Sequence, residues 1–531
     1  MKASHLLVNA RIVTNDPAAP RADGMAIRDG RVVWTGVGGV PDPLKSAVEP
    51  RDMMGAVVLP GFMDAHIHVE GLGLALEELD LAGTAGPEEI LGRAVALAGK
   101  TPEGEWIQGR GWDQNGWPDP SMPTHHAMTE ALPVHPAFLK RIDGHAALVN
   151  GRALDLAGVN AGTPDPEGGR ILRDGAGDPT GVLIDTAMDL VARFIPEPPS
   201  STRRRLIEVG LAECARVGLT MIHVAGADRA ALAIYRRLRE ENRLPIRLYV
   251  MIDGSDDALM REELPKGPQL DPDDLLIVRA VKLYADGALG SRGAALLEPY
   301  SDDPSTRGLL VTDPKRLEGL MRRTHAGGYQ CAVHAIGDRA NRMVLQFYEG
   351  ILRADPGSAP RHRIEHAQIL SPEDVGEFRA LGIVASIQFT HATSDMPWAE
   401  ERLGAARLEG GGYPWKALLD SGAILAGGSD APVESPNPFL GLYAGITRRD
   451  RGGNPPEGWL PRQRLSPGEA LEAATLGAAR AAFVEDRLGR LAPGYRADFV
   501  VTDTDPLADP PAALLDARIR ETWVGGARVF P

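Results

Sequence analysis

Eight short apolar segments, each about as long as a β-strand, recur through the middle of this 531-residue chain, and helical patterns lie between them. Alternating strands and helices are typical of βα units, whose strands form a parallel sheet. Eight such units suit a closed (β/α)₈ barrel of the TIM type, and an open doubly wound sheet is the alternative. The expected strands are residues 58–68, 219–225, 246–252, 277–285, 329–335, 363–368, 383–387 and 423–428. The clearest expected helices are residues 203–217, 314–326, 339–352, 372–381 and 414–421.

Both ends of the chain have a different texture. Short β-branched segments separated by turns occupy 5–13, 24–28 and 31–35 near the start, and 498–502 and 521–529 near the end. We therefore expect one small β-sandwich domain built from both termini, residues 1–58 and 488–531. The barrel domain would then span 59–487.

A stretch from about residue 70 to 200 interrupts the strand and helix alternation. It is rich in glycine and proline and contains the segment WIQGRGWDQNGWP. We interpret it as an insertion after the first barrel strand. Because active sites of such barrels lie at the carboxyl ends of the strands, this insertion is expected to roof the pocket. Residues 436–467, also rich in loop-forming residues, are a second lid candidate.

The overall charge excludes some classes of partner. A formal net charge of −15 argues against nucleic-acid binding and against a polybasic membrane anchor. The start of the chain lacks the pattern of a signal peptide, and no segment reaches the roughly 18 apolar residues of a membrane span. We expect a cytoplasmic protein with a small-molecule substrate, whose Cys214 and Cys331 are buried thiols. A homodimer is compatible with the sequence.

The first candidate site residues are His66 and His68, at the end of the first barrel strand. Residues two apart in a strand point to the same face, so both imidazoles project together. Two imidazoles on one face can bind a divalent cation, although a hydrogen-bonded histidine pair is the plainer interpretation.

Residues at the ends of other strands favour a metal site over a hydrogen-bonded histidine pair. His334, His366 and Asp430 each stand where an apolar segment meets a turn, which places them at the same rim as the histidine pair. Lys282 lies within the fourth strand, and the alternating pattern around it predicts an inward side chain. A neutral lysine can react with CO₂ to form a carbamate, an anionic oxygen ligand. A salt bridge from Lys282 to Asp286 or to another carboxylate is the alternative.

Seven motifs together resemble the amidohydrolase superfamily, and within it the amidohydrolase-3 group of YtcJ-like proteins, which includes N-substituted formamide deformylase. The resemblance covers essentially the whole chain, with one departure at Phe389, where the group's pattern has proline. The motifs are PGFMDAHIH, GWDQNGW, VKLYADGALGSR, VHAIGDRA, RIEHAQI, THATSDMPWAEERLG and GGSDAPVESPNP.

The resemblance implies a site with one or two divalent metal ions, with zinc the expected element. His66, His68 and Asp430 would bind the more buried ion, and carboxylated Lys282 would bridge to a second ion held by His334 and His366. A metal-bound hydroxide would attack the substrate carbonyl. Asp430 would pass its proton to the leaving nitrogen.

The expected reaction is therefore hydrolysis of a C–N bond in an amide, N-formyl amine, carbamate or cyclic amide. A mononuclear deaminase of a heterocyclic amine is the nearest alternative, and a barrel that has lost catalysis and serves in binding or regulation is the next. Residues that could contact the substrate fall in the rim and lid segments: Trp112, Asp113, Asp143, His145, Arg292, Gln388 and His391.

Overall fold

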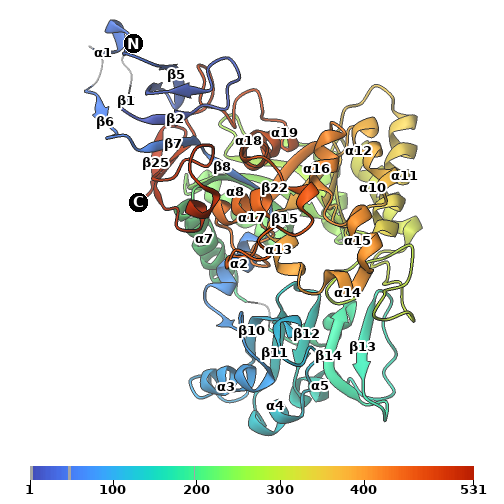
Figure 1. The fold of residues 1–531 in the computed structure, drawn as a ribbon. Helices are drawn as coiled ribbons and strands as arrows, with labels where there is room; N and C mark the ends of the chain where they lie inside the picture. The colour runs from blue at the N-terminus through green and yellow to red at the C-terminus, as the bar shows by residue number, and fades with distance from the viewer. Residues whose placement is uncertain (1–3, 46–48, 197) are drawn as a thin grey trace.

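The computed structural model describes residues 4–45, 49–196 and 198–531, and its centre is a barrel of eight parallel strands (Figure 1). In spatial order from one side of the seam to the other, the strands are β22 (Ile424–Gly428), β21 (Val384–Gln388), β20 (Arg363–His366), β19 (Gln330–Ala335), β18 (Leu276–Tyr284), β16 (Arg247–Asp253), β15 (Leu219–Ala227) and β8 (Phe62–Ile67). At the seam, the backbone N–H of Asp430 donates to the carbonyl of His66 (2.7 Å), and that of His68 donates to the carbonyl of Ala431 (2.8 Å). These bonds bring the last strand of the barrel against the first.

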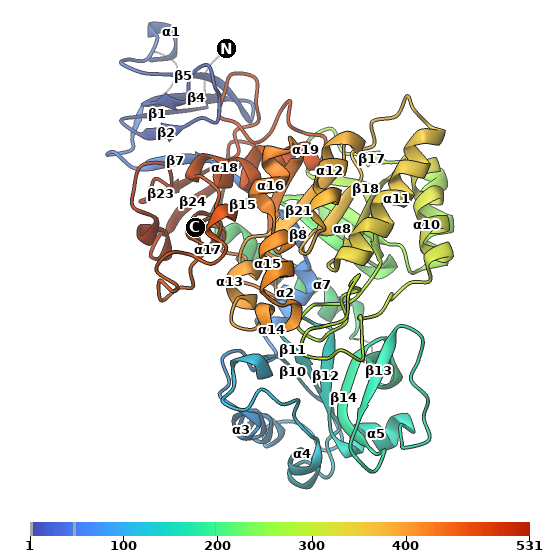
Figure 2. The same ribbon diagram turned by 45° about the vertical axis from the view of Figure 1, so that its right-hand side comes forward.

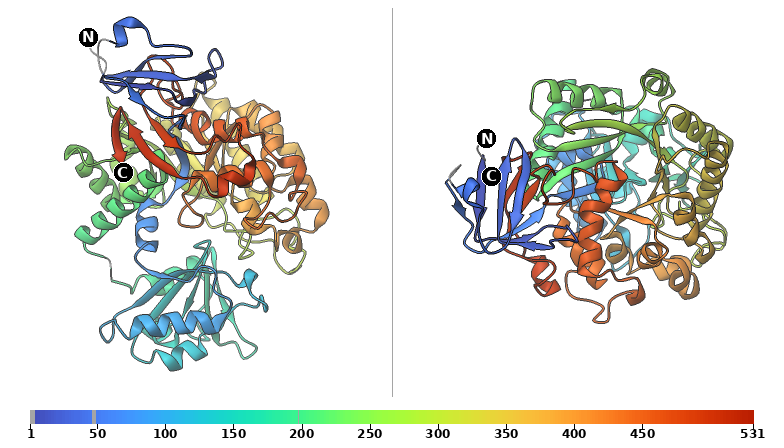
Figure 3. Two further views of the ribbon diagram at one scale, coloured as in Figure 1. Left: turned by 60° about the vertical axis from the view of Figure 1, so that its left-hand side comes forward. Right: turned by 90° about the horizontal axis from the view of Figure 1, so that it is seen from above.

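Helices surround the barrel and bury their apolar faces against it (Figure 3). Amphipathic helices cover a parallel sheet because each strand must bury both of its faces. The five predicted helices are present as α7 (Ser200–Arg216), α10 (Pro314–Ala326), α11 (Asp338–Ala354), α12 (Val375–Leu381) and α16 (Trp415–Asp420). The barrel prediction is confirmed.

The first predicted strand, 58–68, is two strands in the structure. β7 (Val57–Pro60) belongs to a terminal sheet, and β8 begins the barrel. Between them, Gly61 donates its N–H to the carbonyl of Asp498 (2.9 Å) and lies against the Thr220 side chain, where a Cβ atom would have no room. A continuous apolar segment in the sequence cannot reveal a break that is set by contacts from both ends of the chain.

Two sheets built from the chain ends pack beside the barrel (Figure 2). One has the order β5-β4-β1-β6 and the other β25-β24-β23-β7-β2-β3, and buried side chains such as Ile27, Val58 and Phe499 form their shared core. The predicted strand 5–13 is divided into β1 (His5–Val8) and β2 (Arg11–Val13) at Asn9, whose φ is 54°. The remaining terminal strands are β3 (Arg21–Ala22), β4 (Gly24–Arg28), β5 (Arg31–Gly36), β6 (Arg51–Asp52), β23 (Phe499–Thr502), β24 (Ile519–Val524) and β25 (Ala527–Phe530).

The segment after the first barrel strand forms a separate lobe with its own core, seen at the bottom of Figures 1 and 2. Its six-stranded sheet has the order β13-β14-β12-β11-β10-β9, and α3 (Pro87–Ala98), α4 (His126–Ala131) and α5 (Gly151–Ala157) pack against it. The six strands are β9 (Leu79–Asp80), β10 (Ile107–Trp112), β11 (Ala137–Arg141), β12 (Ala146–Val149), β13 (Gly169–Arg173) and β14 (Pro179–Asp185).

The two cysteines and residues 436–467 were also assigned from the sequence. Cys214 and Cys331 are free and buried, as predicted. Residues 436–467, the second lid candidate, line neither of the two larger cavities of the described structure. Four of them, Pro436, Asn437, Pro438 and Gly441, line a small cavity elsewhere. The helix α17 (Pro438–Thr447) instead buries Phe439 and Leu442 in the core. In the described ranges, no helix has both the length and the apolar character needed to cross a bilayer.

Candidate metal centre

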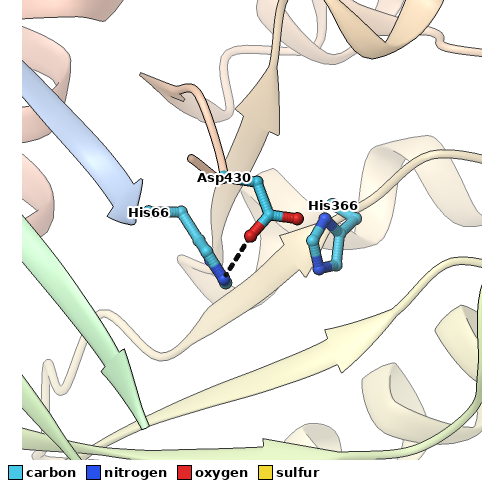
Figure 4. Close-up of side chains that lie close together, drawn as sticks. All are labelled: His66, His366 and Asp430. Carbon is cyan, nitrogen blue, oxygen red and sulfur yellow. Dashed lines mark ion pairs between the residues drawn. The ribbon is translucent and has the colours of Figure 1, made fainter. Parts of the chain in front are cut away.

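Six potential ligand side chains converge at the carboxyl ends of five barrel strands. His66 is the penultimate residue of β8, and His68 directly follows this strand. Lys282 lies in β18, His334 in β19 and His366 at the end of β20. The sixth, Asp430, follows β22. Figure 4 shows His66, His366 and Asp430 facing one another. One donor atom from each of these three lies within 4.8 Å of the other two, close enough to share a cation.

The other three predicted ligands adjoin this group. Nζ of Lys282 lies 2.9 Å from Nε2 of His66, and Nε2 of His68 lies 3.1 Å from Oδ1 of Asp430. The ring centroid of His334 is 4.5 Å from that of His366. The convergence expected from the sequence is therefore present in the structure.

The donor set fits a divalent metal. Nε2 of His334 is buried and has no hydrogen-bond partner among the described residues, as expected of an atom that coordinates an ion. Burial lowers the pKa of His66 to about 4, with Lys282 adding to the effect, and burial holds the pKa values of His334 and His366 well below the ordinary histidine value. Neutral imidazoles are the form that binds metals.

Two hydrogen bonds select the metal-binding tautomer of the histidines. Nδ1–H of His66 donates to Oε2 of Glu365 (2.5 Å), and Nδ1–H of His366 donates to Oε1 of Gln388 (2.8 Å). Each ring therefore presents the lone pair of Nε2 to the site. Such partners also fix the ring orientation, which is how outer residues tune a metal site.

Lys282 is buried inside the barrel, as the alternating pattern predicted. Burial lowers the pKa of its amine to about 8, although the nearby Glu365 and Asp430 carboxylates act in the opposite direction. The alternative salt bridge to Asp286 is not formed, since that carboxylate accepts backbone N–H groups of Ala295 and Gly337, each at 2.8 Å, and of Ile336 at 3.0 Å. The lowered pKa increases the share of neutral amine, the form that carbamate formation requires.

The backbone is strained at two of the converging residues. His366 has a φ of 77° and Asp430 a φ of 59°, in the left-handed region that residues other than glycine rarely adopt. Strain of this kind persists only where surrounding contacts impose it, and it gathers at functional sites. Around Asp430 those contacts come from Asp64, which accepts hydrogen bonds from the N–H and the hydroxyl of Ser429.

Two cavities meet at the ligand cluster. The larger, of about 1000 Å³, lies between the barrel and the inserted lobe, and His68 lines it. The smaller, of about 240 Å³, is also lined by residues of both the barrel and the inserted lobe, and His391 lines it. The residues common to both walls are Asp143, His145, His334, His366, Asp430 and Val433.

Comparison with known proteins agrees with this architecture. The model of the Amidohydrolase family matches residues 51–530. The chain belongs to the amidohydrolase family.

Three curated relatives are similar along most of their length. The protein LONG AFTER FAR-RED 3 of Arabidopsis thaliana is 35% identical over 100% of this chain and 92% of its own. The putative amidohydrolase YtcJ of Bacillus subtilis is 35% identical over 91% and 90%, respectively, and N-substituted formamide deformylase of Arthrobacter pascens is 26% identical over 98% and 97%. The predicted membership of the YtcJ-like amidohydrolase-3 group is confirmed.

A solved structure shares the fold. An uncharacterized metal-dependent hydrolase from Pyrococcus horikoshii has a TM-score of 0.77 and 27% identity, covering 96% of this chain and 99% of its own. The barrel with its additional sheets is therefore an arrangement found in a known amidohydrolase-like protein.

Within this amidohydrolase, the predicted substrate residues divide into two groups. Asp113, Asp143, His145 and His391 line one or both cavities. Trp112, Arg292 and Gln388 line neither.

The second group has other contacts. Trp112 is fully buried in the core of the inserted lobe and donates its Nε1–H to the carbonyl of Leu139 (2.7 Å). Arg292 pairs with Asp302 (2.9 Å). Gln388 reaches the site only through its hydrogen bond with His366 (2.8 Å).

Sequence reasoning missed Glu365 and Asp185. Glu365 follows Arg363 on the same inward face of β20, and the two form a fully buried ion pair (2.7 Å) beneath His66. The attraction of Arg363 and His66 outweighs burial and holds the pKa of Glu365 below its usual range. Asp185 accepts a hydrogen bond from Nδ1 of His145 (2.6 Å). The available signal was the strand alternation that places Arg363 and Glu365 on one face.

Proposed function

We propose that this protein is a metal-dependent hydrolase that cleaves the C–N bond of an amide, N-formyl amine, carbamate or cyclic amide. The observation that carries the proposal is the position of Lys282. Its side chain is buried, and its Nζ lies 2.9 Å from Nε2 of His66. Among the described residues, it forms no ion pair with a carboxylate. A buried lysine beside the His66, His366 and Asp430 cluster suits a carbamate that would be shared by two cations.

The residues suggest how two ions would be held. His66, His68 and Asp430 would hold the first and His334 and His366 the second, with carboxylated Lys282 shared between them. Zinc is our candidate, since imidazole and carboxylate ligands suit it, as they also suit manganese, iron and nickel. A bound ion of this kind lowers the pKa of a water molecule and polarises a carbonyl group.

Asp430 is the candidate for proton transfer. Its side chain faces His66 and His68 through Oδ1 and His391 through Oδ2. The close approach of His68 (3.1 Å) and the electrostatic influence of His66 and His366 outweigh burial and hold its pKa well below the ordinary value. As a carboxylate it would accept a proton from the attacking water and donate it to the leaving nitrogen, a step an amine leaving group requires.

The relatives support an amide-like substrate. One of them is named for deformylation of N-substituted formamides, which breaks a C–N bond next to a carbonyl carbon. Its resemblance to this chain extends over nearly the full length of both.

The proposal is tested by assaying purified protein, stripped with a chelator and then reloaded with Zn²⁺ or Mn²⁺, against a panel of N-formyl and N-acyl amines. We expect metal-dependent release of free amine, and about two ions per chain by elemental analysis. One ion per chain, with ammonia released from a heterocyclic amine, would instead identify a deaminase. Metal-replete protein that hydrolyses none of the panel would contradict the proposal.

A further inference from the structure

The small cavity has a distinct charge. Besides the ligand Asp430, four carboxyl side chains line it: Asp113, Asp143, Asp395 and Glu434. Arg141 is the one guanidinium or ammonium group in the described part of this wall. His145 also lines it, and the hydrogen bond to Asp185 (2.6 Å) outweighs burial and raises the pKa of this histidine to about 9, so its charge is balanced by that carboxylate. A cavity with low-dielectric walls and one sign of charge attracts ligands of the other sign.

Arg141 is not free to bind an anion. It is fully buried and forms ion pairs with Asp113 and, at 2.6 Å, with Asp143, while its Nε donates to Gln114 (2.9 Å). Two carboxylates thus neutralise the single guanidinium. The remaining acidic groups of the wall, Asp395 and Glu434, accept hydrogen bonds from neutral side chains in the described structure.

These two acids face His391. Burial raises the pKa of Asp395 to about 7 and raises that of Glu434, although His391 acts in the opposite direction, so a cation bound beside them would favour their ionised forms. Tyr413 (2.7 Å) and Gln368 (2.8 Å) both donate to Oδ2 of Asp395, and no described residue hydrogen-bonds to its Oδ1. Ser394 donates to Glu434 (2.5 Å). Nε2 of His391 is buried and has no hydrogen-bond partner in the described structure. The wall therefore has hydrogen-bonding capacity that protein groups leave unused, which a bound ligand can satisfy.

The two oxygens of Asp430 distinguish the two cavities. Oδ1 lies 3.1 Å from His68, which lines only the large cavity, and Oδ2 lies 3.9 Å from His391, which lines only the small one. A nitrogen that takes its proton from Oδ2 is on the His391 side. The leaving half of the substrate then enters the small cavity, and the acyl half the large one.

Resting on the proposed amide hydrolysis, we infer that the small cavity holds the amine half of the substrate and prefers amines that carry positive charge. As the C–N bond breaks, its electron pair stays on nitrogen, which takes the proton from Asp430. An alkylamine has a pKa near the lysine value of about 10.4, so the released amine takes a second proton from water and becomes a cation. The acidic wall stabilises that cation and disfavours amines that carry a carboxylate, such as amino acids. At about 240 Å³, the cavity is below the roughly 300–1,000 Å³ of sites for drug-sized ligands, so the amine is small.

A matched pair of ligands tests the charge preference by calorimetry on the metal-loaded protein. Choline and 3,3-dimethylbutan-1-ol have the same shape, but choline alone is a cation, and its quaternary nitrogen cannot coordinate a metal. We expect choline to bind at least tenfold more tightly. Equal binding, tighter binding of the alcohol, or no binding of choline would overturn the inference.

Variants of acidic residues in each cavity show which cavity causes the preference for choline. Glu434→Gln is expected to reduce the preference for choline at least threefold, and Asp395→Asn offers a second test if the first variant fails to fold. Asp189→Asn is the control, because Asp189 lines the large cavity alone. A preference that survives both small-cavity changes, or that is lost only in the control, would overturn the assignment.

Choline binding is measured without turnover, so the experiments can reject the cationic subsite and the proposed amide hydrolysis independently of each other. If choline binds as expected but no amide is hydrolysed, the cationic subsite stands and the proposed reaction is wrong. If amides are hydrolysed but N-acyl amino acids are preferred over N-acyl alkylamines, the reaction stands and the subsite inference is wrong.

Discussion

Oε2 of Glu365 lies 2.5 Å from Nδ1 of His66, and the two residues are 299 positions apart in the chain. Both side chains are fully buried. Arg363 pairs with the same carboxylate and also donates to the carbonyl of Ala65 (2.6 Å), one residue before the histidine. This group of contacts links β20 to β8 directly below the ligand cluster.

Glu365→Gln is expected to weaken metal binding by about 10- to 100-fold, because the residues that orient a ligating histidine contribute that much to affinity. Competition with a chelator of known affinity measures the change. Glu373→Gln is the matched control, since Glu373 pairs with Arg342 on the surface. Unchanged affinity in Glu365→Gln would show that His66 does not depend on this carboxylate.

Asp430→Asn is expected to retain bound metal and to lose about 100-fold or more of the turnover rate, because the amide oxygen can still face the cation but the amide cannot transfer the proton. Elemental analysis and amine release are measured on the same preparation. Wild-type turnover in this variant would refute proton transfer by Asp430.

If the proposed carbamate bridge exists, Lys282→Ala is expected to bind one ion fewer than the wild type, because the shared ligand would be removed. Added short carboxylic acids, which can occupy the vacated space and supply an anionic oxygen, should restore part of the activity. Lys315→Ala, a change at an exposed lysine of α10, serves as control. Full metal stoichiometry in Lys282→Ala would argue against the bridge.

Gly293→Ala is expected to lower both the melting temperature and the activity. A Cβ at this position would lie 2.8 Å from Oδ2 of Asp185, which holds His145 through its other oxygen. Crowding of this kind costs about 1–3 kcal/mol. In Gly319→Ala, within α10, the new atom meets nothing within 4 Å, and the helix should gain about 0.4–1 kcal/mol. Opposite shifts in thermal unfolding check the pair, and two shifts in the same direction would contradict it.

The stability of the protein should fall on acidification because of His362. Burial, with His325 nearby, lowers the pKa of this histidine to about 3, whereas an unfolded chain has a value of about 6.5. Between those values the unfolded state binds more protons, so stability is present above pH 6.5 and is lost as the pH falls toward 3. At 1.36 kcal/mol per unit, the loss from pH 7 to pH 5 is about 2 kcal/mol.

Thermal unfolding at pH 7 and pH 5 checks this dependence. His362→Gln should reduce the difference between the two pH values, whereas His126→Gln, at an exposed position, should leave it in place. An identical difference in all three proteins would show that His362 is not the source.

The sequence by itself determined the barrel and which candidate ligands lie at its rim. Strand and helix patterns repeat over a few residues, so each unit can be read locally, and parallel strands bring their carboxyl ends to one rim. The sequence could therefore predict that His66, His68, Lys282, His334, His366 and Asp430 lie near one another, and their role as metal ligands stays a prediction. Only the tertiary structure decided the break at Gly61, the buried position of Trp112, the bond between Glu365 and His66, and the acidic wall of the small cavity. Each of these depends on contacts between distant segments, and no local period in the sequence encodes which buried side chains meet.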